Sequence, residues 1–209
     1  MHIRTNEPLA RHTYFKLGGP ADQFVEVGTR DELIEAVRYA IKTNLPYLVL
    51  GGGSNVLILD KGYRGLVIKN KTSKVELKGF TGSATKGKVD LKEILVSAES
   101  GVPANLLVRY TVDQGLAGLD DMLGLPGTVG GAIYNNSHHL GQLWGDHIVE
   151  VEVLDQSGKV KKYSRDDMHF AYDYSVLHKT RETVLSATFQ LTKGDKITLW
   201  EIASAAVKR

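Results

Sequence analysis

Two glycine-rich segments carry the strongest chemical signal in this sequence of 209 residues. The first reads Gly-Gly-Gly-Ser-Asn over residues 51–55, and the second spans residues 124–132. Clustered glycines let backbone N–H groups converge on phosphate oxygens without obstruction by side chains. Ser54, Asn55 and Thr128 would add side-chain donors. Together the segments predict a site for a phosphorylated ligand, although either one alone is equally compatible with a tight turn, since glycine is the default turn residue.

Neither segment fits the common nucleotide fingerprints. Residues 51–55 are not followed by Lys-Ser or Lys-Thr, and the next apolar runs, 56–59 and 66–68, predict a strand and not a helix. The segment is therefore neither a P-loop nor a Rossmann turn, in which a helix N-terminus faces the pyrophosphate. A dinucleotide held by two loops from two domains remains open.

Two other sets of polar side chains are candidates for a metal site or for catalysis. His138, His139 and His147 lie close together but have no carboxylate at ligand spacing, so we expect an exposed loop and no metal. Ser137 and Ser175 have no obvious histidine and aspartate companions. Spacing alone neither supports nor excludes a hydrolytic triad there.

The overall composition narrows the class of protein. Lysine and arginine total 26 against 24 acidic residues, a net charge of +2 that gives no general field for nucleic acid or anionic lipid. The absence of cysteine excludes disulfides, thiolate-bound zinc and thiol chemistry. The N-terminus lacks the apolar core of a secretory signal, and no apolar run approaches the roughly 20 residues that span a bilayer. We expect a cytoplasmic protein without membrane or nucleic-acid partners.

A small α/β domain is predicted for residues 1–70. The sequence Thr-Arg-Asp-Glu at 29–32 is typical of a capping box, and apolar residues at helical spacing follow until a stop near Asn44. Apolar runs on both sides, 24–27 and 47–50, predict buried strands. The strand, helix, strand unit would place residues 51–55 at the end of its second strand.

Residues 71–209 predict a larger domain that is rich in strands. Strands are expected at 75–77, 89–98, 148–154, 159–163 and 183–191, with 148–163 forming a hairpin across residues 155–158. The polar connection 79–88 is expected to be mobile.

Two helices accompany these strands. The first helix would have Pro103 in its first turn and would stop at Gly115. Three of its side chains are expected to point inward: Leu106, Leu107 and Tyr110. The second, at 199–209, would present one apolar face: Trp200, Ala203, Ala206 and Val207. Exposure of that face would drive self-association.

Four segments resemble one family. Residues 13–21, 50–55, 118–119 with 124–132, and 172–175 stand in an order and at spacings similar to those of UDP-N-acetylenolpyruvoylglucosamine reductase. Four matches in register are more specific than any one of them, and the resemblance covers about residues 8–207. It implies an α+β, two-domain FAD-binding fold of the vanillyl-alcohol-oxidase type, in which a small α/β domain and a larger antiparallel-sheet domain with helices hold the cofactor between them.

The resemblance also implies where FAD binds. Residues 51–55 would hold the pyrophosphate, and residues 126–132 would run beside pyrophosphate, ribityl chain and flavin ring, where backbone amides stabilise charge on reduced flavin. The implied cofactor-binding residues are Leu50, Gly51, Gly52, Gly53, Ser54, Asn55, Val56, Gly124, Pro126, Gly127, Thr128, Gly130, Gly131, Ala132, Asn136 and Val184. Tyr172 would either stack near the flavin or fill the sheet core, and core packing is the favoured interpretation.

The implied reaction is the reduction of a UDP-sugar. NADPH reduces FAD, and reduced FAD then reduces the enolpyruvyl group of UDP-N-acetylglucosamine enolpyruvate to give UDP-N-acetylmuramate, a peptidoglycan precursor. Asp173 stands where the family usually has a catalytic arginine, and its opposite charge cannot polarise a substrate carboxylate. It indicates either a rearranged active site or, the interpretation we favour, a surface carboxylate.

A second departure concerns length. The family's third domain covers the substrate and supplies the proton-donating serine and a glutamate, and this sequence ends where that domain would begin. We therefore expect weak or absent reductase turnover from the chain as given. The alternatives are a non-catalytic flavin-binding module, or glycine segments that bind another phosphorylated ligand or nothing.

Overall fold

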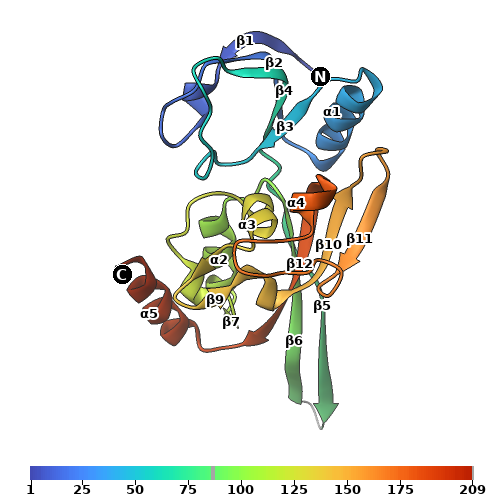
Figure 1. Ribbon diagram of the computed structural model, residues 1–209. Coiled ribbons are helices and arrows are strands. Elements are labelled where there is room, and N and C mark those ends of the chain that lie inside the picture. The colour runs from blue at the N-terminus through green and yellow to red at the C-terminus, as the bar shows by residue number, and fades with distance from the viewer. Residues whose placement is uncertain (86–87, 209) are drawn as a thin grey trace.

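The protein contains two main β-sheets with helices packed on them (Figure 1). The computed structural model describes residues 1–85 and 88–208. The four strands of the first sheet end at Asn70, and the second sheet starts at Val75. None of the helices in this described part is both long and apolar enough to cross a membrane.

The first sheet has the strand order β1-β2-β4-β3. β2, β4 and β3 run parallel and β1 pairs antiparallel at the edge, with these bounds: β1 Arg4–Pro8, β2 Pro20–Val27, β3 Tyr47–Leu50 and β4 Tyr63–Asn70. Helix α1 (Arg30–Lys42) begins at the predicted capping box, where the Glu32 amide donates to Thr29 Oγ1 and Glu32 Oε2 accepts from the Thr29 amide. Apolar side chains are buried on both faces, as parallel strands require.

The second sheet is antiparallel, in the order β11-β10-β12-β6-β5, and β7 pairs with the end of β12. Its strands are β5 Val75–Thr85, β6 Lys88–Glu99, β7 Leu116–Ala117, β10 Ile148–Leu154, β11 Val160–Ser164 and β12 Thr183–Lys193. One core joins them to helices α2 (Ala104–Asp113), α3 (Val129–Asn135) and α5 (Lys196–Val207). Trp144 and Phe189 are its largest side chains and meet edge to face at 5.6 Å.

Short elements connect these parts. They are the 3-10 helices η1 (Leu9–His12), η2 (Asp120–Met122) and η3 (Trp144–His147), helix α4 (Leu177–Thr180), and the paired strands β8 (His138–His139) and β9 (Gln142–Leu143).

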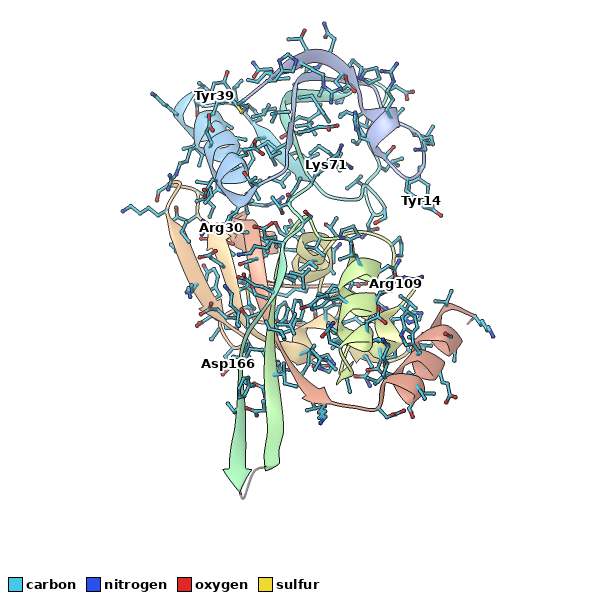
Figure 2. All side chains as sticks on the ribbon, turned by 180° about the vertical axis from the view of Figure 1, so that it is seen from behind. Tyr14, Arg30, Tyr39, Lys71, Arg109 and Asp166 are labelled. Carbon is cyan, nitrogen blue, oxygen red and sulfur yellow. The ribbon has the colours of Figure 1, made fainter. Side chains whose placement is uncertain are left out.

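Contacts between the two sheets hold the domains together. Leu154 and Leu185 of the second sheet pack into the core beneath α1. At the junction, where Figure 2 labels Arg30, Nε and Nη2 of that arginine donate to Glu152 Oε2 at 3.0 and 2.8 Å. Arg38 Nε also donates to the carbonyl of Gly158 at 2.9 Å. These charge-assisted bonds from α1 to the second sheet set the width of the space between the domains.

Two expectations about strands and their connections need correction, and one helix was not predicted. Residues 56–59 do not form a strand, because the Leu59 carbonyl accepts from the amides of Gly19 and Gly62 and not from a ladder. β5 extends to Thr85 through the connection expected at 79–88, of which 86–87 lie outside the described residues. The helix α3 was not predicted, since its Val-Gly-Gly start has low helix propensity.

The helix faces also differ in part from expectation. The buried positions of α2 are Ala104, Leu107, Val108, Thr111 and Val112, a spacing that leaves Leu106 on the outer side, 47% exposed. In α5, Leu199 is buried with Ala203 and Ala206, whereas Val207 is 57% exposed. Gly115 has φ +68° just after α2, as the predicted stop requires.

Candidate functional site

A cavity of about 1140 Å³ lies between the two domains. This volume slightly exceeds the ~300–1,000 Å³ typical of small-molecule sites, so the cavity has room for an extended ligand. It is lined by both glycine segments and, among others, by Leu45, Tyr47, Leu125, Tyr134, His138, Gln156, Asp173 and Val184.

The first glycine segment follows β3 directly and is held from behind. Lys69 Nζ, on β4, donates to the carbonyl of Gly51 at 2.5 Å. The carbonyl of Gly53 accepts from the Tyr14 amide at 2.8 Å. In a trans peptide the carbonyl and the following N–H point in opposite directions, so the amides of residues 52 and 54 face away from these partners. Among the described residues neither amide donates to a protein acceptor.

The second glycine segment leads into α3. The carbonyl of Gly127 accepts from the Ala104 amide at 3.0 Å, which turns the Thr128 amide the opposite way. The Gly130 amide donates to the Ser100 carbonyl at 2.8 Å, whereas that of Gly131 has no acceptor in the described part of the chain. The segment is thus anchored on one side and has free donors on the other.

The two segments lie in direct contact. A β-carbon on Gly51 would overlap Thr128 Oγ1, and one on Gly52 would lie 2.9 Å from Gly127 Cα. A β-carbon on Gly127 would in turn lie 3.0 Å from Ser54 Oγ. The expected convergence of two glycine segments 70 residues apart is confirmed, and glycine is required where the backbones approach most closely.

Lys69 supplies a positive charge beneath the first segment. Burial, the largest cause, lowers the pKa of its amine, and the nearby charges of Lys71 and Lys16 lower it further, while Glu26 opposes them. A half-buried cation that uses its protons to hold the loop would also attract an anionic ligand on the other side of it. Sequence reasoning missed this residue, although a lysine at the end of the apolar run Leu-Val-Ile was a visible signal.

Most of the residues named from the sequence line this one cavity: Leu50, Gly51, Gly52, Gly53, Ser54, Asn55, Val56, Pro126, Gly127, Thr128, Gly130, Gly131, Ala132, Val184 and Asp173. Gly124 and Asn136 do not. Asn136 is fully buried, where Nδ2 donates to the Ala171 carbonyl and Oδ1 accepts from the Gly145 amide, both at 2.8 Å. The side-chain amide of Asn136 is therefore occupied by the protein's own backbone. The backbone amide of Gly124 is also occupied, because it donates to Asn105 Oδ1.

The remaining polar candidates are placed as follows. Asp173 is 60% exposed and adopts φ +50° in the turn closed by Ala171 and Tyr174. Tyr172 is 72% exposed, so the expectation that it fills the sheet core is wrong, because this turn carries its ring outward. Ser175 is buried and donates to the Tyr134 carbonyl at 2.7 Å, which leaves it no part in a triad.

Two of the three histidines that lie close together in the sequence, His139 and His147, have separate surroundings. His139 Nδ1 lies 2.7 Å from the Asp121 carbonyl, and burial lowers the pKa of His147. No group of three or more potential metal ligands occurs within residues 1–85 and 88–208.

A family model described as an FAD binding domain matches residues 21–164. The chain belongs to this FAD-binding family. The match contains both glycine segments and Lys69 but stops before Asp173 and β12.

The chain as a whole is also similar to proteins named as reductases. It is 36% identical over 190 residues to UDP-N-acetylenolpyruvoylglucosamine reductase of Caldanaerobacter subterraneus subsp. tengcongensis, covering 91% of this chain and 59% of the relative. The Streptococcus pyogenes enzyme of the same name is 38% identical over 200 residues, covering 94% and 62%. The resemblance expected from four segments is confirmed. The chain spans about three fifths of the length of these relatives.

Solved structures show the same fold. The UDP-N-acetylenolpyruvylglucosamine reductase of Thermus caldophilus superposes with a TM-score of 0.77 and 29% identity, covering 99% of this chain and 68% of that one. A VAO-type flavoprotein from Myceliophthora thermophila gives a TM-score of 0.60 at 18% identity over 83% of this chain. The expected vanillyl-alcohol-oxidase-type fold is confirmed.

The residues of the FAD-binding domain fit a dinucleotide. Glycines leave space along both segments, the free amides at 52, 54, 128 and 131 are donors for phosphate oxygens, and Lys69 adds positive charge. The cavity is also lined by residues outside both glycine segments, among them Tyr47, Tyr134 and Gln156, so the ligand can contact the protein beyond its phosphates.

Proposed function

We propose that this chain is the FAD-binding part of an NADPH-dependent reductase that converts UDP-N-acetylglucosamine enolpyruvate to UDP-N-acetylmuramate. The contact between the two glycine segments, on one cavity between two domains, is the observation that carries the proposal. The sequence identity of 35–38% with reductases of that activity supports it.

In this proposal the chain has two domains, 1–70 and 71–209, which grip the cofactor from opposite sides. The amides at 52 and 54 would meet the pyrophosphate together with those at 128 and 131. Of the cavity-lining residues, we assign Tyr47, Gln156 and Val184 to the adenosine, and Leu125 and Tyr134 to the flavin ring. FAD held there would supply the chemistry for hydride transfer between NADPH and the enolpyruvyl group.

Purification of the protein tests FAD binding directly. We expect a yellow protein with a flavin visible spectrum, or a colourless one that binds added FAD with quenching of flavin fluorescence. Release of the chromophore and mass spectrometry would separate FAD from FMN. A colourless protein that refuses FAD would refute the proposal and favour another phosphorylated ligand.

A non-catalytic flavin-binding module is the second candidate. The exposed carboxylate of Asp173 at the cavity end favours it, because a negative charge there opposes a substrate that carries a carboxylate. Anaerobic stopped-flow spectroscopy separates the two candidates. A reductase loses flavin absorbance with NADPH and regains it with the enolpyruvyl substrate, whereas a module does neither.

We further propose a cytoplasmic location and self-association through α5. The inner face of this helix is covered by the chain itself, and Arg109 of α2, labelled in Figure 2, lies 5.8 Å from the Trp200 ring. Ile197, Ile202 and Val207 remain exposed on the outside. A sedimentation run that shows only monomer at high concentration would refute self-association.

A further inference from the structure

A buried polar cluster joins the two domains beside the cavity. Asn70 is the last residue of β4 in the first sheet, and Ser100 directly follows β6 in the second. Lys71, labelled in Figure 2, comes next after Asn70 in the chain. Asn70 is 5% exposed and Ser100 is 2% exposed, yet both residues line the cavity. Neither belongs to a glycine segment or to the cofactor-binding residues that the family resemblance implies.

The backbone fixes the orientation of the Asn70 side-chain amide. The Thr72 N–H can only donate, and its nitrogen lies 3.0 Å from Asn70 Oδ1. The amide nitrogen Nδ2 therefore faces the other way and donates to Ser100 Oγ at 2.8 Å. Thr72 is held in turn, because its Oγ1 accepts from the Gly101 amide at 2.9 Å. The direction of the bond between Asn70 and Ser100 is thus determined by their neighbours.

This bond leaves the hydroxyl proton of Ser100 without a partner. A hydroxyl group has one proton to donate and lone pairs that accept. Ser100 Oγ uses a lone pair for Asn70, and no acceptor among the described residues takes its proton. Buried donors in proteins are nearly always paired, because an unpaired one loses its bond to water and gains nothing. A free donor on a residue that lines the cavity indicates an acceptor supplied by a ligand.

Ser100 lies directly against the second glycine segment. Its carbonyl accepts from the Gly130 amide at 2.8 Å. A β-carbon on Gly130 would lie 2.8 Å from Ser100 Cβ, so only the absence of a side chain at Gly130 allows this approach. The same segment carries the free amides of Thr128 and Gly131. The hydroxyl adds one more donor to this group of donors, an arrangement that suits phosphate oxygens.

We propose that Ser100 donates its hydroxyl proton to a pyrophosphate oxygen of FAD and that Asn70 is the residue that positions it. The inference rests on the proposed function, in which only backbone amides and Lys69 meet the phosphates. The hydrogen bonds run in one direction, from Asn70 to Ser100 and from Ser100 to the phosphate, and each polarises the next. Because Asn70 belongs to the first domain and Ser100 to the second, bound FAD strengthens a contact between the domains.

Phosphorus-31 NMR of the FAD-loaded protein tests the contact without turnover. Ser100→Ala should shift a pyrophosphate resonance of bound FAD but leave the visible flavin spectrum unchanged, because the hydroxyl meets the phosphate and not the ring. Ser97→Ala is the matched control, since Ser97 of β6 is also buried but does not line the cavity. Both of its spectra should match those of the wild type. Pyrophosphate resonances of Ser100→Ala at the wild-type positions overturn the proposal.

Fluorescence titration with FAD measures the strength of the contact. Ser100→Ala should bind FAD about tenfold more weakly, as expected for the loss of one hydrogen bond to a charged group. Ser100→Cys is a second variant of nearly the same size, and because a thiol is a weak donor it should also lose affinity. It separates loss of the donor from loss of packing. Wild-type affinity in both variants overturns the proposal.

A double-mutant cycle tests the positioning role of Asn70. Asn70→Ala should weaken FAD binding when Ser100 is present but have little further effect in Ser100→Ala, because Asn70 acts through the hydroxyl. Asn70→Asp keeps the acceptor for the Thr72 amide and takes the Ser100 proton itself, so it should also remove the effect of Ser100→Ala on the phosphorus spectrum. A purely structural Asn70 would give fold changes that multiply, and that result overturns its positioning role.

The outcomes separate this inference from the function on which it rests. A wild-type protein that does not bind FAD refutes the proposed function. A wild-type protein that binds FAD, together with a Ser100→Ala variant that binds it equally well and gives the same phosphorus spectrum, overturns the role of Ser100 alone.

Discussion

The contact between the two glycine segments can be tested by adding and then removing a few atoms. In Gly51→Ala the new β-carbon overlaps Thr128 Oγ1 and lies 3.3 Å from Thr128 Cγ2. Thr128 is buried and branched at the β-carbon, so its side chain has little freedom to turn away. Overpacking of this kind costs about 1–3 kcal/mol. We expect Gly51→Ala to be destabilised by that amount.

Removal of the threonine side chain should relieve the overlap. In Gly51→Ala/Thr128→Ala the two closest of these atoms are gone, and the added carbon lies 3.4 Å from the β-carbon at position 128, which is an ordinary van der Waals contact. Thr128→Ala alone should cost about 1 kcal/mol for its buried methyl and hydroxyl groups. The double variant should therefore be no less stable than Thr128→Ala. The two changes would couple favourably by about 1–3 kcal/mol, within the range seen for residues in contact.

Thermal and urea unfolding of the four proteins without FAD measure this coupling. One kcal/mol corresponds to a shift of about 2–4 °C in Tm for a chain of this size. Thr128→Ser keeps Oγ1 and should not rescue Gly51→Ala. Gly52→Ala is a second control, because its β-carbon meets the backbone of Gly127, which no side-chain change removes. Strictly additive effects of Gly51→Ala and Thr128→Ala would refute the contact.

Three further outcomes are expected. Lys69→Met should weaken FAD binding about 5–30-fold in fluorescence titrations, as loss of 1–2 kcal/mol implies, but leave riboflavin binding unchanged. Burial lowers the pKa of Lys69, so the wild-type protein should lose FAD affinity as pH rises towards 10.5, whereas the affinity of Lys69→Met should not change over this range. Equal pH profiles for the two proteins would contradict the role of the Lys69 charge. Glu152→Gln should lower stability to urea by about 1 kcal/mol, since Arg30 keeps only a neutral partner, and no change would show that the bridge does not hold the domains. Backbone and hydroxyl donors lower the pKa of Asp155 in the folded protein. Its contribution to stability is therefore present above the pKa of the unfolded chain, about 3.9, and is lost as pH falls. Acid unfolding of Asp155→Asn should depend less on pH than that of the wild type.

Local signals in the sequence were enough to place many elements. The capping box at Thr29, the hairpin of β10 and β11, and β3 ending at Leu50 were all predicted from contiguous residues. Each depends on hydrogen bonds or periodicity within one short segment, which tertiary packing did not override. The outward position of Leu106 was missed because α2 contains apolar residues on more than one side, and only the packed core selects among them.

The sequence by itself determined that two glycine segments are rich in potential phosphate donors, and the resemblance of four segments determined the family. Only the tertiary structure decided that the segments touch, that Lys69 lies behind the first of them, and that Asn70 meets Ser100. The physical reason is that these contacts join residues separated by 18 to 77 positions, including segments in different domains. Periodicity reports the neighbours of a residue within its own helix or strand. The docking of two sheets, through Arg30 and the shared core beneath α1, is what brings the distant segments together.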